Sequence, residues 1–167
     1  MTFDEFIAAR LPALLRYAMF LTGDGHLADD LVQESMVKAH SHWKRVERAD
    51  SPELYVRRMV TNTYLSWRRG NWFRRAIPYG DVPDTGVPDE TEATALRQDL
   101  WARLLALPPR QRAAVVLRFY EGMSDREIAD VLGCAVGTVR SLISRAVVSL
   151  REVMGASGAR GTRGGRS

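Results

Sequence analysis

Residues 124–151 read SDREIADVLGCAVGTVRSLISRAVVSLR, and they determine how the whole chain is interpreted. Ser124, with Glu127 three residues later, predicts a capping box at the start of a short helix. The inner face of that helix is apolar: Ile128, Val131 and Leu132. Gly133 suits the left-handed residue that ends it, and a longer helix begins by Thr138. The stretch therefore predicts two helices joined by a tight turn.

The longer helix has two chemically different faces. On a helical wheel its apolar side holds Val139, Ile143, Ala146 and Leu150, flanked by Leu142 and Val147. The opposite side holds Arg140, Ser141, Ser144, Arg145 and Val148. A helix fits the major groove of DNA, where arginine pairs bidentately with guanine and serine bonds to bases or phosphate. This pattern favours a DNA-binding helix-turn-helix over a helical hairpin with surface arginines.

The composition is that of a globular protein with a modest basic excess. The chain has 167 residues, of which 46% are hydrophobic and 26% charged, and its formal net charge is +4. The single cysteine, Cys134, cannot form an intramolecular disulfide, which fits a reducing cytoplasm. The first residues carry acids where a signal peptide needs positive charge. No window approaches the roughly 18 apolar residues of a membrane span, so we expect a cytoplasmic protein without membrane insertion.

Two segments divide the chain. Residues 76–96, AIPYGDVPDTGVPDETEATAL, hold three prolines, two glycines and five acids without Lys or Arg, which predicts a flexible acidic linker. Residues 155–167 are rich in Gly and Arg and predict a disordered tail. The predicted domains are therefore residues 1–75 and 97–154.

Both domains show helical rather than strand periodicity, so we expect an all-α fold of two small helical domains. In the first, apolar residues recur from Phe3 to Ala18, and Pro12 either bends that helix or opens a second one. A second helix is predicted from about Leu27 to Trp43. A third begins with Ser51 as N-cap and Pro52 at its first position. In the second domain, helices are predicted over residues 100–107 and 109–120, before the helix-turn-helix.

Residues 107–151 resemble region 4 of bacterial extracytoplasmic-function (ECF) sigma factors, through the pattern EIADVLG…GTVRS…RA…LR. Residues 21–43, LTGDGHLADDLVQESMVKAHSHW, resemble region 2 of the same family, whose signature is D-L-V-Q-E. Residues 55–70, YVRRMVTNTYLSWRRG, resemble the promoter-melting part of that region. The chain is thus similar over about residues 3–152 to the SigE-type group from high-GC bacteria.

The resemblance implies a function and partners. A sigma factor binds core RNA polymerase, directs it to promoters and helps to open the DNA, without an active site or cofactor of its own. Region 2 docks on the polymerase clamp and grips the −10 element, whereas region 4 docks on the flap and reads the −35 element. Many members are held inactive by an anti-sigma protein, although nothing in this sequence names one.

The resemblance also implies roles for individual residues. Core polymerase would be bound by the signature residues Asp30, Leu31, Val32, Gln33 and Glu34. Asp30 and Glu34 share one helix face and could meet arginines of a partner, although a solvated acidic face is the alternative.

Roles on the promoter follow in the same way. Asn62 matches a family asparagine near the captured −10 base, and residues 46–51 match the loop that receives a flipped-out base. By their chemistry, Trp67, Arg68 and Arg69 would also contact the −10 element, although Trp67 could instead fill the core. Arg57, Arg58 and Tyr64 would add to this surface, because arginines neutralise phosphates and aromatic rings stack on unpaired bases. The −35 element would be read by Arg140, Ser141, Ser144 and Arg145. Leu142 departs from the basic residue that relatives often carry and is expected to pack inward.

Two other classes of function fit parts of the chain. A stand-alone helix-turn-helix regulator would use the second domain alone and would require a dimer on a palindromic site. An enzyme or metal site could involve His26, His40 and His42 beside Asp29, Asp30 and Glu34. The absence of a Gly-rich phosphate loop, a CxxC pair and an HExxH motif argues against catalysis and against a bound metal.

Overall fold

The first half of the chain forms a bundle of helices. The computed structural model describes the backbone of residues 1–70 and 92–161 and the side chains of residues 1–70 and 95–152. Helix α1, Phe3–Thr22, continues through Pro12 without opening a second helix. It begins at Phe3, where the apolar periodicity begins, but the capping box there was not predicted: Thr2 Oγ1 accepts from the Glu5 amide, and the Glu5 carboxylate accepts from the Thr2 amide.

Three further helices complete the first half. Helix α2, Gly25–Ser41, starts two residues earlier than predicted because the Asp24 side chain caps the Leu27 amide. Helix α3 covers Trp43–Arg48. Helix α4, Pro52–Arg69, begins as predicted, with Ser51 capping the Leu54 amide and Pro52 at the first position.

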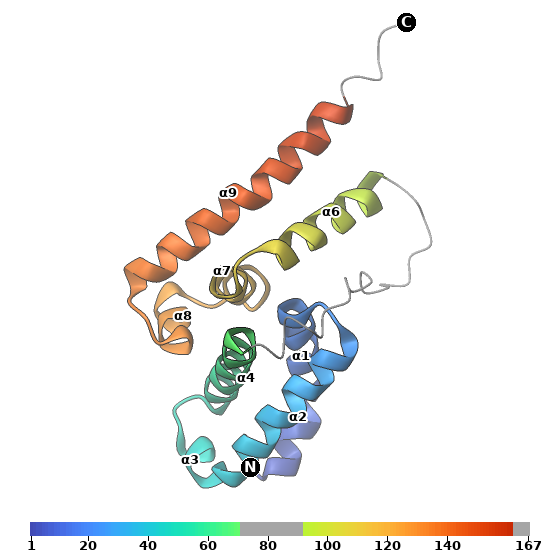
Figure 1. Ribbon diagram of the computed structural model, residues 1–167. Coiled ribbons are helices and arrows are strands. Elements are labelled where there is room, and N and C mark those ends of the chain that lie inside the picture. Colours follow the sequence, from blue (N-terminus) through green and yellow to red (C-terminus); the bar gives the residue numbers. More distant parts are fainter. Residues whose placement is uncertain (71–91, 162–167) are drawn as a thin grey trace, which may run out of the picture.

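The second half is also helical, and its boundaries differ from the prediction in two places. Helix α6, Glu92–Ala106, begins inside the segment predicted as linker. Helix α9, Val136–Gly161, continues into the segment predicted as a disordered tail. Between them lie α7, Pro109–Val115, a π-helical turn η1, Val116–Tyr120, and α8, Asp125–Leu132. Figure 1 shows α6 alongside α9, where Arg103 bonds to the Ser149 carbonyl and to Glu152.

The helix-turn-helix is formed by α8 and α9, which meet at a bend of 99°. Gly133 ends α8 with φ 65°, the left-handed conformation that was predicted. Ser124 caps the Glu127 amide at 3.2 Å, but the reciprocal half of the predicted capping box is not formed. The apolar face of α9 packs inward as predicted, with Val139 and Ala146 fully buried.

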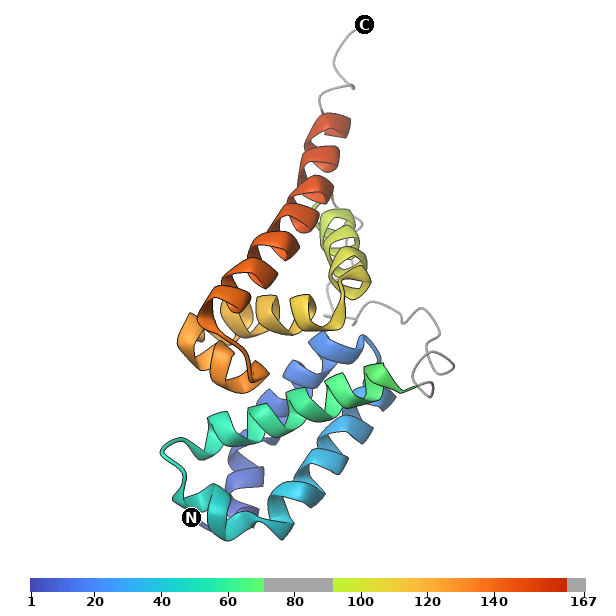
Figure 2. The same ribbon diagram turned by 60° about the vertical axis from the view of Figure 1, so that its left-hand side comes forward.

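The two halves pack against each other and share one hydrophobic core. Helix α4 of the first half lies against α7 and α8 of the second, an arrangement visible from both directions in Figures 1 and 2. The shared core includes Tyr17 and Val60 from the first half and Leu117 and Ile128 from the second. No strand occurs in residues 1–70 or 92–161.

Two buried arginines cross this interface. The Arg57 guanidinium, from α4, meets the Glu121 carboxylate of the second half at 2.6 Å and Glu53 at 3.3 Å. Arg112, from α7, donates to the Leu21 carbonyl at 2.5 Å and to the Tyr64 hydroxyl at 3.0 Å, both in the first half. Buried arginines with several acceptors fix the relative placement of the elements that supply them.

No single helix among the described residues is long and apolar enough to cross a bilayer. Only α8 and the described part of α9, counted together across their bend, reach the length and apolar composition of a membrane span. The inward faces of both helices belong to the protein core described above.

Candidate polymerase and nucleic-acid interface

The acidic signature on α2 is split between the surface and the core. Asp30, Gln33 and Glu34 are exposed, whereas Leu31 and Val32 are 0% and 2% exposed. Leu31 and Val32 fill the core beneath α2 in this conformation, so their contact with polymerase stays a prediction. Three polar side chains remain available for a partner.

Glu34 is held at one edge of this acidic face by two neighbours. Trp67 Nε1 donates to Glu34 Oε2 at 2.9 Å, and Lys38 Nζ lies 3.4 Å from Glu34 Oε1. A pocket of about 460 Å³ opens there, lined by Asp30, Glu34, Ser66, Trp67 and Gly70. The structure thus brings together residues that the sequence assigned to two separate roles, polymerase binding and −10 binding.

Helix α4 presents some of the predicted −10 residues and buries others. Asn62 and Arg69 are exposed, and Arg68 and Trp67 are half-buried. Arg57 and Tyr64 are 4% and 0% exposed, so in this conformation their side chains are covered, and their contact with nucleic acid stays a prediction. Both face the second half of the chain, where Glu121 and Arg112 are their partners.

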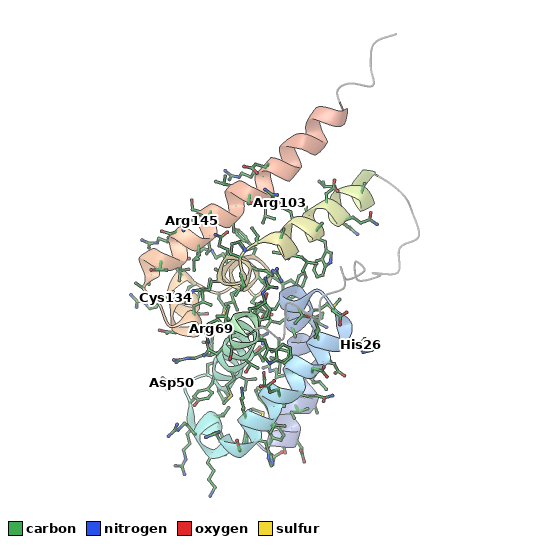
Figure 3. All side chains as sticks on the ribbon, viewed as in Figure 1. His26, Asp50, Arg69, Arg103, Cys134 and Arg145 are labelled. Carbon is green, nitrogen blue, oxygen red and sulfur yellow. The ribbon has the colours of Figure 1, made fainter. Side chains whose placement is uncertain are left out.

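The predicted base-capture loop is shorter than expected. Val46 is fully buried and lies with Arg48 in α3, so only residues 49–51 connect α3 to α4. Ser51 is engaged as the N-cap of α4. Asp50 is exposed at the tip of this connection (Figure 3).

The predicted −35 residues lie on the outer surface of α9. Arg140, Ser141, Ser144 and Arg145 are all exposed, and Figure 3 shows Arg145 on the outside of that helix. Leu142 packs against the core as predicted. The face therefore offers two guanidinium groups and two hydroxyl groups, of which the Ser141 hydroxyl donates to the Gly137 carbonyl at 3.1 Å.

Burial changes the ionisation of groups at the interface between the halves. It raises the pKa of the Tyr17 and Tyr64 hydroxyls above the ordinary tyrosine value and lowers the pKa of the Arg112 guanidinium. Sequence reasoning missed Arg112 altogether, because most of its partners lie far away in the sequence or are backbone carbonyls.

His40 and His42, which the alternative of an enzyme or metal site involved, contact neighbouring residues. His40 stacks against Phe3, with ring centroids 4.7 Å apart, and His42 Nδ1 lies 3.1 Å from the Lys38 carbonyl. Among the side chains that the structure describes, no group of three His, Cys, Asp or Glu could hold a metal ion.

Comparison with known proteins places both halves in one family. Residues 6–74 match the family model of sigma-70 region 2, and residues 97–150 match that of sigma-70 region 4. The RNA polymerase sigma-E factor of Streptomyces avermitilis is 39% identical over 150 residues, covering 90% of this chain and 83% of that protein. The ECF RNA polymerase sigma factor SigL of Mycobacterium tuberculosis is 33% identical over 153 residues, covering 89% and 84%.

The chain belongs to the ECF sigma factors. Members of this family are transcription initiation factors without catalytic activity.

Two solved structures share the arrangement seen here. The sigma factor RpoE from Bartonella quintana, solved with the anti-sigma factor NepR, matches with a TM-score of 0.72 and 27% identity, covering 91% of this chain and 96% of that one. CnrH, solved with the cytosolic domain of CnrY, matches in fold with a TM-score of 0.63 and 24% identity, covering 92% and 88%. In this sigma factor, α1–α4 correspond to region 2 and α6–α9 to region 4.

Proposed function

We propose that this chain is a promoter-specificity subunit of RNA polymerase whose contact residues lie on three exposed faces. The observation that carries the proposal is the family match of both halves in the order region 2, then region 4, with polar faces left exposed on α2, α4 and α9. In this function the chain joins core polymerase, contacts promoter DNA and helps to open it.

The polymerase contact is assigned to Asp30, Gln33 and Glu34 on α2. Asp30 makes no hydrogen bond or ion pair with any residue that the structure describes, so its carboxylate is free to meet a basic partner. Glu34 is already oriented by Trp67 and Lys38. An acidic patch with one preoriented member suits the arginines of a polymerase helix.

The DNA contacts are assigned to two helices. Asn62, Trp67, Arg68 and Arg69 on α4 form the −10 surface, where the arginines would pair with phosphates and the indole could stack on an unpaired base. Arg140, Ser141, Ser144 and Arg145 on α9 form the −35 surface, which enters the major groove.

The same function supports two further assignments. A subunit of bacterial RNA polymerase works in the cytoplasm, which the family and the single unpaired cysteine favour. An anti-sigma protein is proposed as a regulatory partner because the similar RpoE was solved with one.

Gel filtration with bacterial core RNA polymerase tests this function. We expect the native chain to co-elute with core enzyme and the Asp30→Ala/Glu34→Ala variant to elute alone. Asp29→Ala is the matched control, since Asp29 is also an exposed acid on α2 outside the signature. If the native chain does not co-elute but binds duplex DNA as a dimer, it is a stand-alone helix-turn-helix regulator instead.

A further inference from the structure

Asp125 lies where the helix-turn-helix meets the preceding η1 turn. It is the first residue of α8, and its side chain is 22% exposed. One carboxylate oxygen, Oδ1, accepts a hydrogen bond from Arg118 Nη1 of η1. The other, Oδ2, accepts from Arg140 Nε of α9 at 3.4 Å. The carboxylate thus links three elements, and the first turn of a helix favours its negative charge.

This contact determines which nitrogens of Arg140 remain available. The side chain is 72% exposed, and Nη1 and Nη2 have no partner among the described residues. A guanidinium is planar, so a bond at Nε restricts the orientation of the whole group. Bidentate recognition of guanine O6 and N7 needs two parallel N–H groups, and the free Nη1 and Nη2 provide them.

We propose that Asp125 is a positioning residue that orients Arg140 for bidentate contact with a guanine in the upstream promoter element. The inference rests on the proposed function. Arg118 fixes the position of the Asp125 carboxylate, and the carboxylate in turn fixes the orientation of Arg140. The arrangement sits beside a groove of about 330 Å³ between η1, α8 and α9, whose lining includes Arg118, Asp125, Arg140 and Ser144. Asp125 itself makes no contact with the base.

The proposal predicts effects of opposite sign on preference and on affinity. Removal of Asp125 leaves Arg140 free to rotate, so the preference for guanine falls. Removal of its negative charge also lowers repulsion of phosphates, so affinity for DNA of unrelated sequence rises. A merely structural residue would weaken both.

The experiment uses the full chain bound to bacterial core polymerase and a library of duplexes randomised across the upstream element. Bound sequences are compared for the native chain and for Asp125→Ala, Asp125→Asn, Arg140→Ala and the Asp125→Ala/Arg140→Ala double variant. Asp130→Ala is the matched control, because it removes another exposed carboxylate from α8 that has no contact with Arg140. Thermal unfolding of each variant verifies that it folds.

We expect one position at which native preference for guanine is lost in Arg140→Ala, by roughly 5- to 150-fold. In Asp125→Ala the preference for guanine falls on the order of threefold or more at that position alone. In Asp125→Asn it falls less, because the amide oxygen still accepts a hydrogen bond from Arg140 Nε. The double variant is no worse there than Arg140→Ala, and Asp130→Ala keeps the native profile.

An unchanged profile for Asp125→Ala would overturn the proposal while leaving the proposed function intact. The proposal would also be overturned if Asp125→Ala reduced base preference equally at all positions. It would be overturned as well if the losses of the two single variants multiplied in the double variant. An Arg140→Ala profile identical to the native one would overturn both this proposal and the −35 role of Arg140. Failure of the native chain to join core polymerase would instead overturn the proposed function itself.

Discussion

Among the arginines whose side chains the structure describes, replacement of Arg112 by methionine should destabilise the folded protein more than replacement of any other except Arg57. Arg112 is 2% exposed, and its guanidinium donates to five acceptors, namely the carbonyls of Leu21, Leu104, Leu105 and Leu107 and the Tyr64 hydroxyl. Methionine preserves much of the volume but supplies no donor. The acceptors from both halves of the chain would then lose their partner inside the core.

The magnitude follows from the acceptors that are wholly buried. The Leu21 and Leu107 carbonyls and the Tyr64 hydroxyl are such acceptors, and each costs about 1–3 kcal/mol when it is left unsatisfied. Relief from desolvating the guanidinium offsets part of this cost. We expect a net loss of about 3–5 kcal/mol in the free energy of unfolding, which corresponds to a fall in Tm of roughly 6–20 °C for a chain of this size.

Urea unfolding followed by far-UV circular dichroism measures this loss. Arg110→Met is the matched control, because Arg110 is an exposed residue of the same helix and should change stability by less than about 0.5 kcal/mol. Arg112→Lys should fall between the two, since one ammonium cannot reach acceptors on both sides of the planar fork. A loss below about 1 kcal/mol for Arg112→Met would refute the claim that these hydrogen bonds hold the halves together.

Three further predictions concern pH, the turn of the helix-turn-helix and the interface between the halves. Burial raises the pKa of the Tyr17 hydroxyl, so the unfolded chain loses that proton at a lower pH than the folded chain, and stability should fall as pH rises above about 10. In Tyr17→Phe the urea midpoint should fall less steeply with pH in this range. An equally steep fall in the variant would contradict this cause. Gly133→Ala should lower the free energy of unfolding by about 1 kcal/mol, because the φ of Gly133 is 65°. Gly137→Ala should raise it by about 0.5 kcal/mol, because Gly137 is a helical residue with open space around it. Equal changes in Tm for the two variants would contradict this. Finally, elements named −10 and −35 are about 25 base pairs or about 85 Å apart, so α4 and α8 should separate when the chain binds polymerase and promoter. Energy transfer between dyes on Cys134 and on a cysteine at the exposed position Val37 should then decrease, and unchanged transfer would show that the halves stay packed.

Local signals in the sequence were sufficient for most of the fold. The start of α4 was predictable because the Ser51 cap and Pro52 are adjacent, and the turn after α8 was predictable because only Gly133 suits a left-handed residue there. The start of α6 was missed because prolines and acids before Glu92 obscured the helix-forming residues that follow them.

The candidate site was predicted less completely, because long-range partners leave no local pattern. Arg57 looked like one of a row of exposed arginines, yet its partner Glu121 is 64 residues away in the other half. The signature on α2 combines two functions within five residues, since Leu31 and Val32 fill the core while Asp30 and Glu34 face outward. Only the packing of the helices separates residues that hold the fold from residues left free for partners.

Run-off transcription tests the central claim most directly. Core RNA polymerase would be incubated with and without this chain on fragmented bacterial genomic DNA of high GC content, and the 5′ ends of the transcripts would be sequenced. The account predicts chain-dependent 5′ ends that share two sequence elements upstream, and it predicts their loss with Asp30→Ala/Glu34→Ala but not with Asp29→Ala. Identical transcripts with and without the chain, although the chain is folded and binds duplex DNA, would contradict it.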